Sequence, residues 1–338
     1  MPETLLYPDA GKWLVGFLMA VDRLAVATGL LVLLGGAGFL AVARLPEPAW
    51  RLIRRLEWRI WRLLRVAWWA TFLGTLAGLL LYGPFTADLP LSRAVDAALL
   101  AQTLGTPFGV VWAVRVGLLL LVVCLPAWSK PEAAPARTSA WVAVGLLAAA
   151  LAVTPTLSGH AGSGPDAAMG VAVGVVHFAA AAIWFGGLVL LGTCVLPRAQ
   201  VALLPAVPRF SSVAFTAMVV IVVTGIMQGW RQLGGLHALG HTAYGRLLVA
   251  KVAVFLLLIA VAARSRVLVR RRLTARALAD AMAPHHPAGS AAPAGPDDDA
   301  DARTLWLLRR SVLAEVSIAI GVLAVTALLG IAMPPTAV

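Results

Sequence analysis

The chain has 338 residues, of which 61% are hydrophobic and 12% are charged, with a mean hydropathy of +0.90. Soluble domains use roughly 45–50% apolar and about 25% charged residues, so this composition excludes a soluble globular protein and predicts an integral membrane protein. The net charge of +12 does not indicate nucleic-acid binding, because the arginines gather beside apolar segments, where they set orientation and contact lipid headgroups.

Eight apolar segments have the length of about 20 residues that is needed to cross the hydrocarbon core of a bilayer. Helices are expected throughout, because open strands would leave backbone polar groups unpaired in lipid. The fold class is therefore predicted as an all-α bundle of about eight transmembrane helices, in a single polytopic domain over residues 1–338. The expected spans are 14–43, 63–83, 108–127, 139–156, 167–196, 209–230, 244–265 and 305–332.

The distribution of arginine predicts the orientation of the bundle. Arginines are concentrated in a basic connection at 44–65 and again just after the seventh span. By the positive-inside rule both regions face the cytoplasm, so both termini face outward. The stretch 267–304 is rich in alanine, proline, glycine and aspartate, and it is expected to form a flexible cytoplasmic loop. The loops expected outside are 84–107, 157–166 and 231–243.

Four ionisable residues fall near the middle of predicted spans, where each costs about 2.5–3.5 kcal/mol on insertion scales. They are Asp22, Arg115, Lys251 and Glu315. We expect two buried ion pairs, Asp22 with Arg115 and Lys251 with Glu315, each formed at a common depth. Structural contacts between helices and a role in gating or proton movement both remain open for these pairs.

Histidine and methionine residues indicate a metal site toward the outer side. His160 lies in a glycine-rich loop and His177 lies inside the fifth span, where an imidazole needs a partner. Met169 lies between them, and Met227 and Met333 lie at the outer ends of other helices. Imidazole and thioether groups together favour copper, and thioether favours Cu(I). The alternatives are that a neighbouring helix holds His177 by a hydrogen bond and that the methionines only fill apolar space.

Two further pairs of residues could take part in a copper path. Cys124 and Cys194 lie near the predicted cytoplasmic ends of their helices, where thiolates could receive Cu(I). Buried cysteines in membrane helices can also be plain small hydrophobic residues. His237 and His241 have i, i+4 spacing in an outer loop, and we expect them to be solvated, since a loop does not provide a helical face.

Five segments together resemble the copper resistance D family, CopD, in order and spacing, over residues 150–335. The resemblance implies an eight-helix protein of the bacterial inner membrane that moves copper, often beside a periplasmic copper-binding protein of the CopC type. Residues matching the family pattern are His160, His177, Trp184, Tyr244, Gly245, Arg246, Lys251 and Glu315. The segments are SGHAGS, VVHFAAAAIWFGGLVLL, RFSSVAFTAMVVIVVTGIMQGW, HTAYGRLLVAKVAVFLLLIAVAARSR and LRRSVLAEVSIAIGVLAVTALLGIAMPP.

The resulting hypothesis is copper transport, with import favoured, through an outer-facing His/Met site in a protein that is not an enzyme. The expected ligands and partners are the copper ion, membrane lipid and a separate CopC-type protein, but no nucleic acid. Two alternatives remain open: a b-type haem electron-transfer protein and a non-transporting assembly subunit of a copper system. Bis-histidine haem ligation would need histidines on two helices at matching depth, and only His177 is clearly intramembrane.

Overall fold

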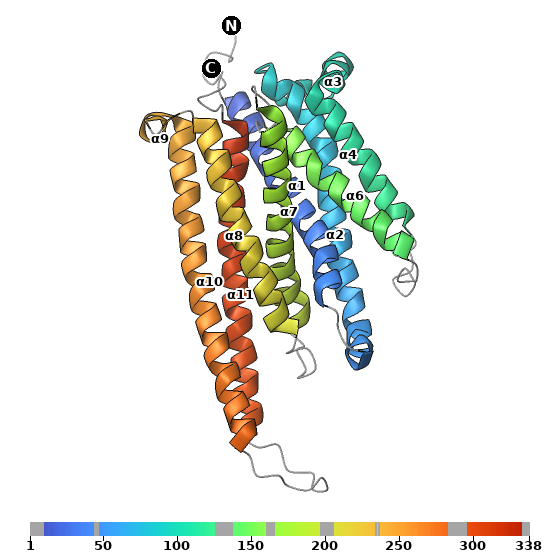
Figure 1. Cartoon of the computed structure of the whole chain (residues 1–338). Helices are drawn as coiled ribbons and strands as arrows, with labels where there is room; N and C mark the ends of the chain where they lie inside the picture. The colour runs from blue at the N-terminus through green and yellow to red at the C-terminus, as the bar shows by residue number, and fades with distance from the viewer. Residues whose placement is uncertain are drawn as a thin grey trace.

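Long helices that run up and down in one bundle make up the protein (Figure 1). The computed structural model describes residues 10–43, 47–125, 138–159, 166–196, 206–233, 235, 237–282 and 296–332, and all regular structure in these ranges is helical. The predicted all-α membrane fold is confirmed. The long helices are α1 Ala10–Ala43, α2 Glu47–Thr86, α4 Pro107–Cys124, α6 Thr138–Leu157, α7 Ala167–Leu190, α8 Ala206–Leu233, α10 Ala243–Met282 and α11 Pro296–Ile331.

Every one of the eight expected spans corresponds to one long helix. Among the described residues, seven helices are long and apolar enough to cross a membrane, and the eighth, α6, has a shorter apolar part at Val142–Leu157. Helix α1 begins and helix α11 ends at the same end of the bundle (Figure 1). We call this the outer end, following the orientation that the arginines predict.

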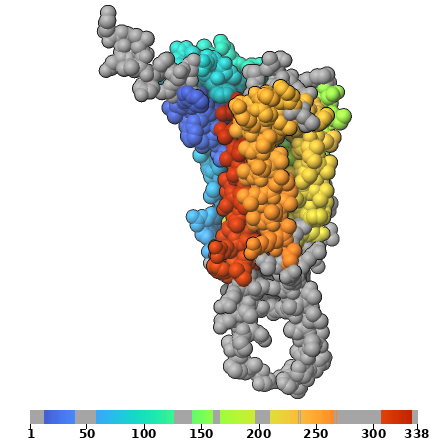
Figure 2. All heavy atoms as spheres, turned by 90° about the vertical axis from the view of Figure 1, so that its left-hand side faces the viewer, coloured from blue at the N-terminus to red at the C-terminus, as the bar shows by residue number. Residues whose placement is uncertain are grey.

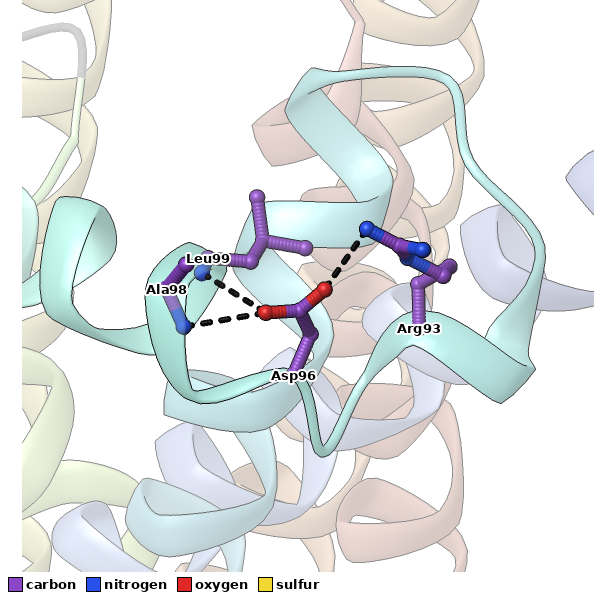
Figure 3. A network of polar contacts seen from close by, with 4 residues as sticks. All are labelled: Arg93, Asp96, Ala98 and Leu99. Carbon is purple, nitrogen blue, oxygen red and sulfur yellow. Dashed lines mark hydrogen bonds and ion pairs between the residues drawn. The ribbon is translucent and has the colours of Figure 1, made fainter.

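Short helices lie at the outer end, within loops that the sequence left without structure (Figure 1). The Asp96 carboxylate caps one of them by accepting hydrogen bonds from the backbone N–H of Ala98 at 2.9 Å and of Leu99 at 3.4 Å. The same carboxylate pairs with Arg93 at 2.6 Å (Figure 3). The short elements are the 3₁₀ turn η2 Leu91–Arg93, α3 Ala97–Leu104 and α9 Ala238–His241.

Two segments that were expected as connections are largely helical. Helix α10 continues to Met282 and α11 begins at Pro296, so the expected flexible loop at 267–304 is wrong for 267–282 and 296–304, and 283–295 lie outside the described residues. Alanine, leucine and arginine are strong helix formers in the first part, and proline followed by aspartates suits a helix start in the second. The basic connection 44–65 likewise belongs to α2 from Glu47 onward.

Helices α1 and α7 pack backbone to backbone at the centre of the bundle. A Cβ atom on Gly35 would lie 1.8 Å from the carbonyl oxygen of Ala182, and one on Gly186 would lie 2.4 Å from that of Leu31. Only glycine lets two helix backbones approach this closely. Such contacts are typical of helix interfaces in membranes, where the hydrophobic effect does not drive helices together. The α1–α7 contact therefore fixes the register on which the rest of the bundle is built.

Helix α10 lies at the edge of the bundle and packs mainly on α11. The two helices are side by side on the face shown in Figure 2. Leucine and valine side chains of α10 are exposed along its length, among them Val249, Val252 and Leu256. This outer surface suits contact with lipid chains.

Candidate functional site

A cavity of about 290 Å³ lies in the outer half of the bundle and is lined by seven helices. We call it the outer cavity. Gly159 and Tyr244 line it near the ends of their helices. His177 and Lys251 line it at greater depth, roughly 15 Å and 12 Å below the starts of α7 and α10 at 1.5 Å per residue. Other residues that line it include Arg23, Leu30, Trp112, Arg115, Thr156, Ser158, Gly225, Gln228, Gln232, Thr326 and Gly330.

The imidazole of His177 is held by a threonine of the neighbouring helix α8. Its Nδ1 lies 2.9 Å from Oγ1 of Thr224. The Thr224 hydroxyl donates its proton to the carbonyl oxygen of Val220 at 2.5 Å, so its oxygen accepts from the ring. With the hydroxyl donating to Val220, this arrangement favours the tautomer that carries the proton on Nδ1, which leaves Nε2 as the ring nitrogen able to bind a ligand. Ligating histidines are commonly oriented in this way by a second hydrogen bond.

His160, the other predicted nitrogen donor, lies outside the described residues. Gly159, the residue before it, lines the outer cavity together with His177. Within the part of the chain that the structure describes, no group of three or more histidine, cysteine, aspartate or glutamate residues is arranged to hold a metal. The convergence of His160 with His177 stays a prediction.

Two of the predicted methionine donors lie away from the outer cavity. Met169 is 59% exposed and Met227 is 41% exposed, and neither lines the outer cavity. Met169 stands eight residues before His177, which places it about 80° around α7 from the histidine. These two thioethers therefore do not converge on His177, and Met333 lies outside the described residues.

The expected direct contact between Asp22 and Arg115 is not formed. The Arg115 guanidinium donates from Nε to Thr154 Oγ1 at 2.8 Å and from Nη2 to Ser158 Oγ at 3.3 Å, both on α6. Asp22 is buried, and its Oδ2 has no hydrogen-bond partner. The positive charges of Arg115 and Arg23 both act on the Asp22 carboxylate. The two predicted partners thus share one buried region without direct hydrogen bonding.

The second expected pair, Lys251 with Glu315, is not placed at a common depth. Val254 of α10 lies beside Gly321 of α11, 3.8 Å from the position of a Cβ atom there. Lys251 lies three residues toward the outer end from this level and Glu315 six residues toward the inner end. At 1.5 Å per residue, the two are separated by roughly 13 Å along the helices. Lys251 therefore belongs to the outer cavity, and Glu315 is buried deeper in the bundle.

The segment from Thr242 to Gly245 builds one wall of the cavity. The backbone N–H of Gly245 donates to Thr242 Oγ1 at 2.9 Å, which caps the start of α10. A Cβ atom on Gly245 would lie 2.1 Å from the carbonyl oxygen of Ala238, so this glycine lets α9 pack directly on α10. Tyr244 is buried, and its hydroxyl donates to the side-chain oxygen of Gln232. This part of the family pattern therefore has a structural role.

Two further residues of the family pattern do not line the cavity. Trp184 is buried in the main hydrophobic core, and Arg246 is exposed at the start of α10. The two cysteines are free thiols, Cys124 exposed and Cys194 buried in the same core as Trp184. The buried thiol lies 3.6 Å from Thr193 Oγ1. Transfer of copper to these thiols stays a prediction.

His237 and His241 stack on each other at the outer end. Their ring centroids are 4.1 Å apart with an interplanar angle of 11°. Both are exposed; His237 is the residue before the short helix α9 and His241 is its last residue, so this loop contains a helical turn that the sequence did not predict. Neither histidine lines the outer cavity.

Three residues that line the cavity, and Thr224 beside His177, were missed by the sequence analysis. Arg23 carried the same signal as Asp22, a charge within a predicted span, and its Nη1 donates to the carbonyl oxygen of Gly330 at 2.8 Å. Thr224 and Gln228 are polar residues of a span and could have been noted for that reason. Trp112 gave no signal, because tryptophan is an ordinary core residue in membrane helices.

The fold and the cavity define a multi-pass α-helical membrane protein with a polar site in its outer half. The family model described as copper resistance protein D-like, N-terminal domain, matches residues 14–171. The model described as copper resistance protein D matches residues 204–329. Together the two models cover most of the chain, which belongs to the copper resistance protein D family and has a copper-related function in the membrane.

A curated relative is the copper transport protein CutJ of Bacillus subtilis (strain 168). It is 28% identical over 173 residues, which are 49% of this chain and 32% of the relative. The chain thus spans about a third of the length of that relative. No solved structure matches the chain.

Proposed function

We propose that this protein transports copper across the bacterial plasma membrane, in the direction of import, with His177 as a nitrogen ligand on the path. The observation that carries the proposal is the ring of His177, which lines a cavity in the outer half of a copper resistance D protein. Thr224 occupies Nδ1 and leaves Nε2 for the metal. Imidazole nitrogen is a common ligand of copper.

His160 is proposed as the second nitrogen ligand. It follows Gly159, which lines the same cavity as His177. A loop ligand at the outer side would receive copper first and pass it to the deeper ring of His177. A separate periplasmic copper-binding protein of the CopC type is the proposed donor. Copper is here the transported substrate, so its binding must be reversible.

Transport is tested with the purified full chain in proteoliposomes that contain a colorimetric Cu(I) chelator. We expect copper to reach the internal chelator at a rate well above that of empty liposomes, and the His177→Ala variant to lose most of this rate. Met169→Leu is the matched control on the same helix, and its rate should stay unchanged. A wild-type rate equal to that of empty liposomes would favour a non-transporting assembly subunit.

The haem alternative is tested by an absorption spectrum of the purified protein. Of the histidines that the structure describes, only His177 lies within the bundle, since His237 and His241 are exposed. Bis-histidine ligation would need two histidines within the bundle at matching depth. We therefore expect no Soret band, and a Soret band that persists after purification would replace copper transport by electron transfer.

Loss of the Thr224 hydroxyl should weaken copper binding without removing the ligand. Thr224→Val takes away the hydrogen bond that orients His177, and changes in such supporting groups typically lower metal affinity about 10- to 100-fold. The measurement is a competition titration against a Cu(I) chelator. Thr224→Ser should restore the affinity, and Thr216→Val, on the exposed face of the same helix, should not change it. Equal affinities of Thr224→Val and wild type would contradict the role of this bond.

A further inference from the structure

We propose that the outer cavity binds a small anion that accepts hydrogen bonds through carboxylate or oxyanion oxygens. This inference goes beyond the proposed transport of copper and does not depend on it. It rests on an excess of positive charge around the cavity and on buried hydrogen-bond donors that have no acceptor. The two observations are independent of each other.

The charges that line the cavity are all positive among the described residues. Arg23, Arg115 and Lys251 line it, and no aspartate or glutamate does. Asp22 lies behind this lining, and its single carboxylate acts on both arginines. One carboxylate cannot balance the two guanidinium groups, and Lys251 adds to the basic character of the lining. Buried charge without compensation is costly at this depth, so a bound anion would stabilise the arrangement.

Three buried hydrogen-bond donors on the cavity residues have no partner. They are Nε of Arg23, Nε1 of Trp112 and Nε2 of Gln228. The three residues come from α1, α4 and α8, and all of them line the outer cavity. Trp112 is only 3% exposed. Buried donors in native proteins are nearly always paired, so each unpaired donor requires an explanation. A ligand that accepts and does not donate satisfies all three.

The positions of these groups are fixed by other contacts. Nη1 of Arg23 donates to Gly330, and a side chain at position 330 would meet that same nitrogen at 2.8 Å. The Arg115 guanidinium lies over the ring of Trp112 at 5.0 Å and is tied to Thr154. Arg23 and Trp112 are therefore held in place by contacts with the protein, which favours binding because little freedom is lost.

The size of the cavity suits a small anion together with water. Its volume of about 290 Å³ leaves room for a small anion and several water molecules. Water alone would satisfy the donors but would leave the positive charge unbalanced. A copper ion at Nε2 of His177 would meet the positive charges of the arginines, and an anion beside it would relieve this repulsion. The anion thus gives a physical reason why a metal cation and a cationic cavity can coexist.

The test is equilibrium dialysis of the copper-free purified full chain against labelled sulfate and, separately, labelled succinate. We expect saturable binding of at least one of them. Lys251→Met should weaken it at least tenfold and Trp112→Phe at least threefold. Arg264→Gln removes an exposed cation from the same helix as Lys251 and should leave the affinity unchanged. Should Lys251→Met fail to fold, Trp112→Phe and Gln228→Leu carry the comparison.

Each outcome decides the proposal. Binding of sulfate alone assigns an inorganic oxyanion, and binding of succinate alone assigns an organic carboxylate. Absence of saturable binding of both probes, or binding that Lys251→Met and Trp112→Phe leave unchanged, overturns the proposal and leaves a cavity filled with water only. The His177→Ala variant should still bind the anion. If the wild-type protein bound the anion but no copper, the copper transport proposal would be refuted and the anion proposal would stand.

Discussion

Replacing His177 with alanine is expected to lower the copper bound per molecule of purified protein at least tenfold. The imidazole is the described group best placed to ligate copper, since its Nε2 is free while Nδ1 is bonded to Thr224. Loss of a direct ligand should exceed the roughly 10- to 100-fold loss that is typical for its supporting partners. The measurement is copper content after loading and dialysis, and His160→Ala should show a loss of similar size.

The His177→Ala variant should remain folded. The Thr224 hydroxyl already donates to Val220, so removal of the ring leaves no buried donor without a partner. A thermal melt within a few degrees of wild type would confirm this point. Met169→Leu and Met227→Leu serve as controls, because both methionines are exposed and lie outside the cavity. Full copper content in His177→Ala would remove His177 from the site.

The Gly35→Val substitution is expected to abolish the folded protein. Its Cβ atom would lie 1.8 Å from the Ala182 carbonyl oxygen, a backbone atom that cannot turn aside. Overpacking typically costs about 1–3 kcal/mol, and a clash with backbone at the central helix pair should reach or exceed about 3 kcal/mol. The measurement is the yield of monodisperse protein on size-exclusion chromatography, together with its melting temperature.

Gly38→Ala on the same helix is the matched control. A Cβ atom there would lie 3.6 Å from a side-chain carbon of Ile183, which is an ordinary contact. We expect yield and melting temperature close to those of wild type. If Gly35→Val behaved like Gly38→Ala, α1 and α7 would not be packed as the structure shows.

Composition was enough to predict the all-α fold class, because lipid leaves the backbone few alternatives. Each expected span corresponds to a long helix, and seven of these helices are long and apolar enough to cross a membrane among the described residues. The short helices α3 and α9 were not predicted; α3 depends on local capping by Asp96, and α9 has only four residues. The extension of α10 beyond the membrane was also missed. Alanine and arginine in 267–282 are strong helix formers, but they are also common in soluble loops. Composition alone therefore did not distinguish a helix from a loop.

The site was predicted only in part, because the sequence of an apolar helix does not reveal its rotation or register. Helix α7 is hydrophobic on all sides, so nothing in its pattern shows that Met169 turns away while His177 faces the cavity. Thr224 is one of several hydroxyl residues on α8 and is separated from His177 by 47 positions. The depth of Lys251 relative to Glu315 is set by contacts such as Val254 with Gly321. Such contacts exist only in the folded bundle.

The most direct test of the proposed site is X-ray absorption spectroscopy of the copper-loaded full chain. We predict a first shell that contains nitrogen, with the outer-shell scattering of imidazole, and a marked loss of that scattering in His177→Ala at equal copper concentration. A first shell made only of sulfur, or a spectrum identical in wild type and His177→Ala, would contradict copper ligation by His177.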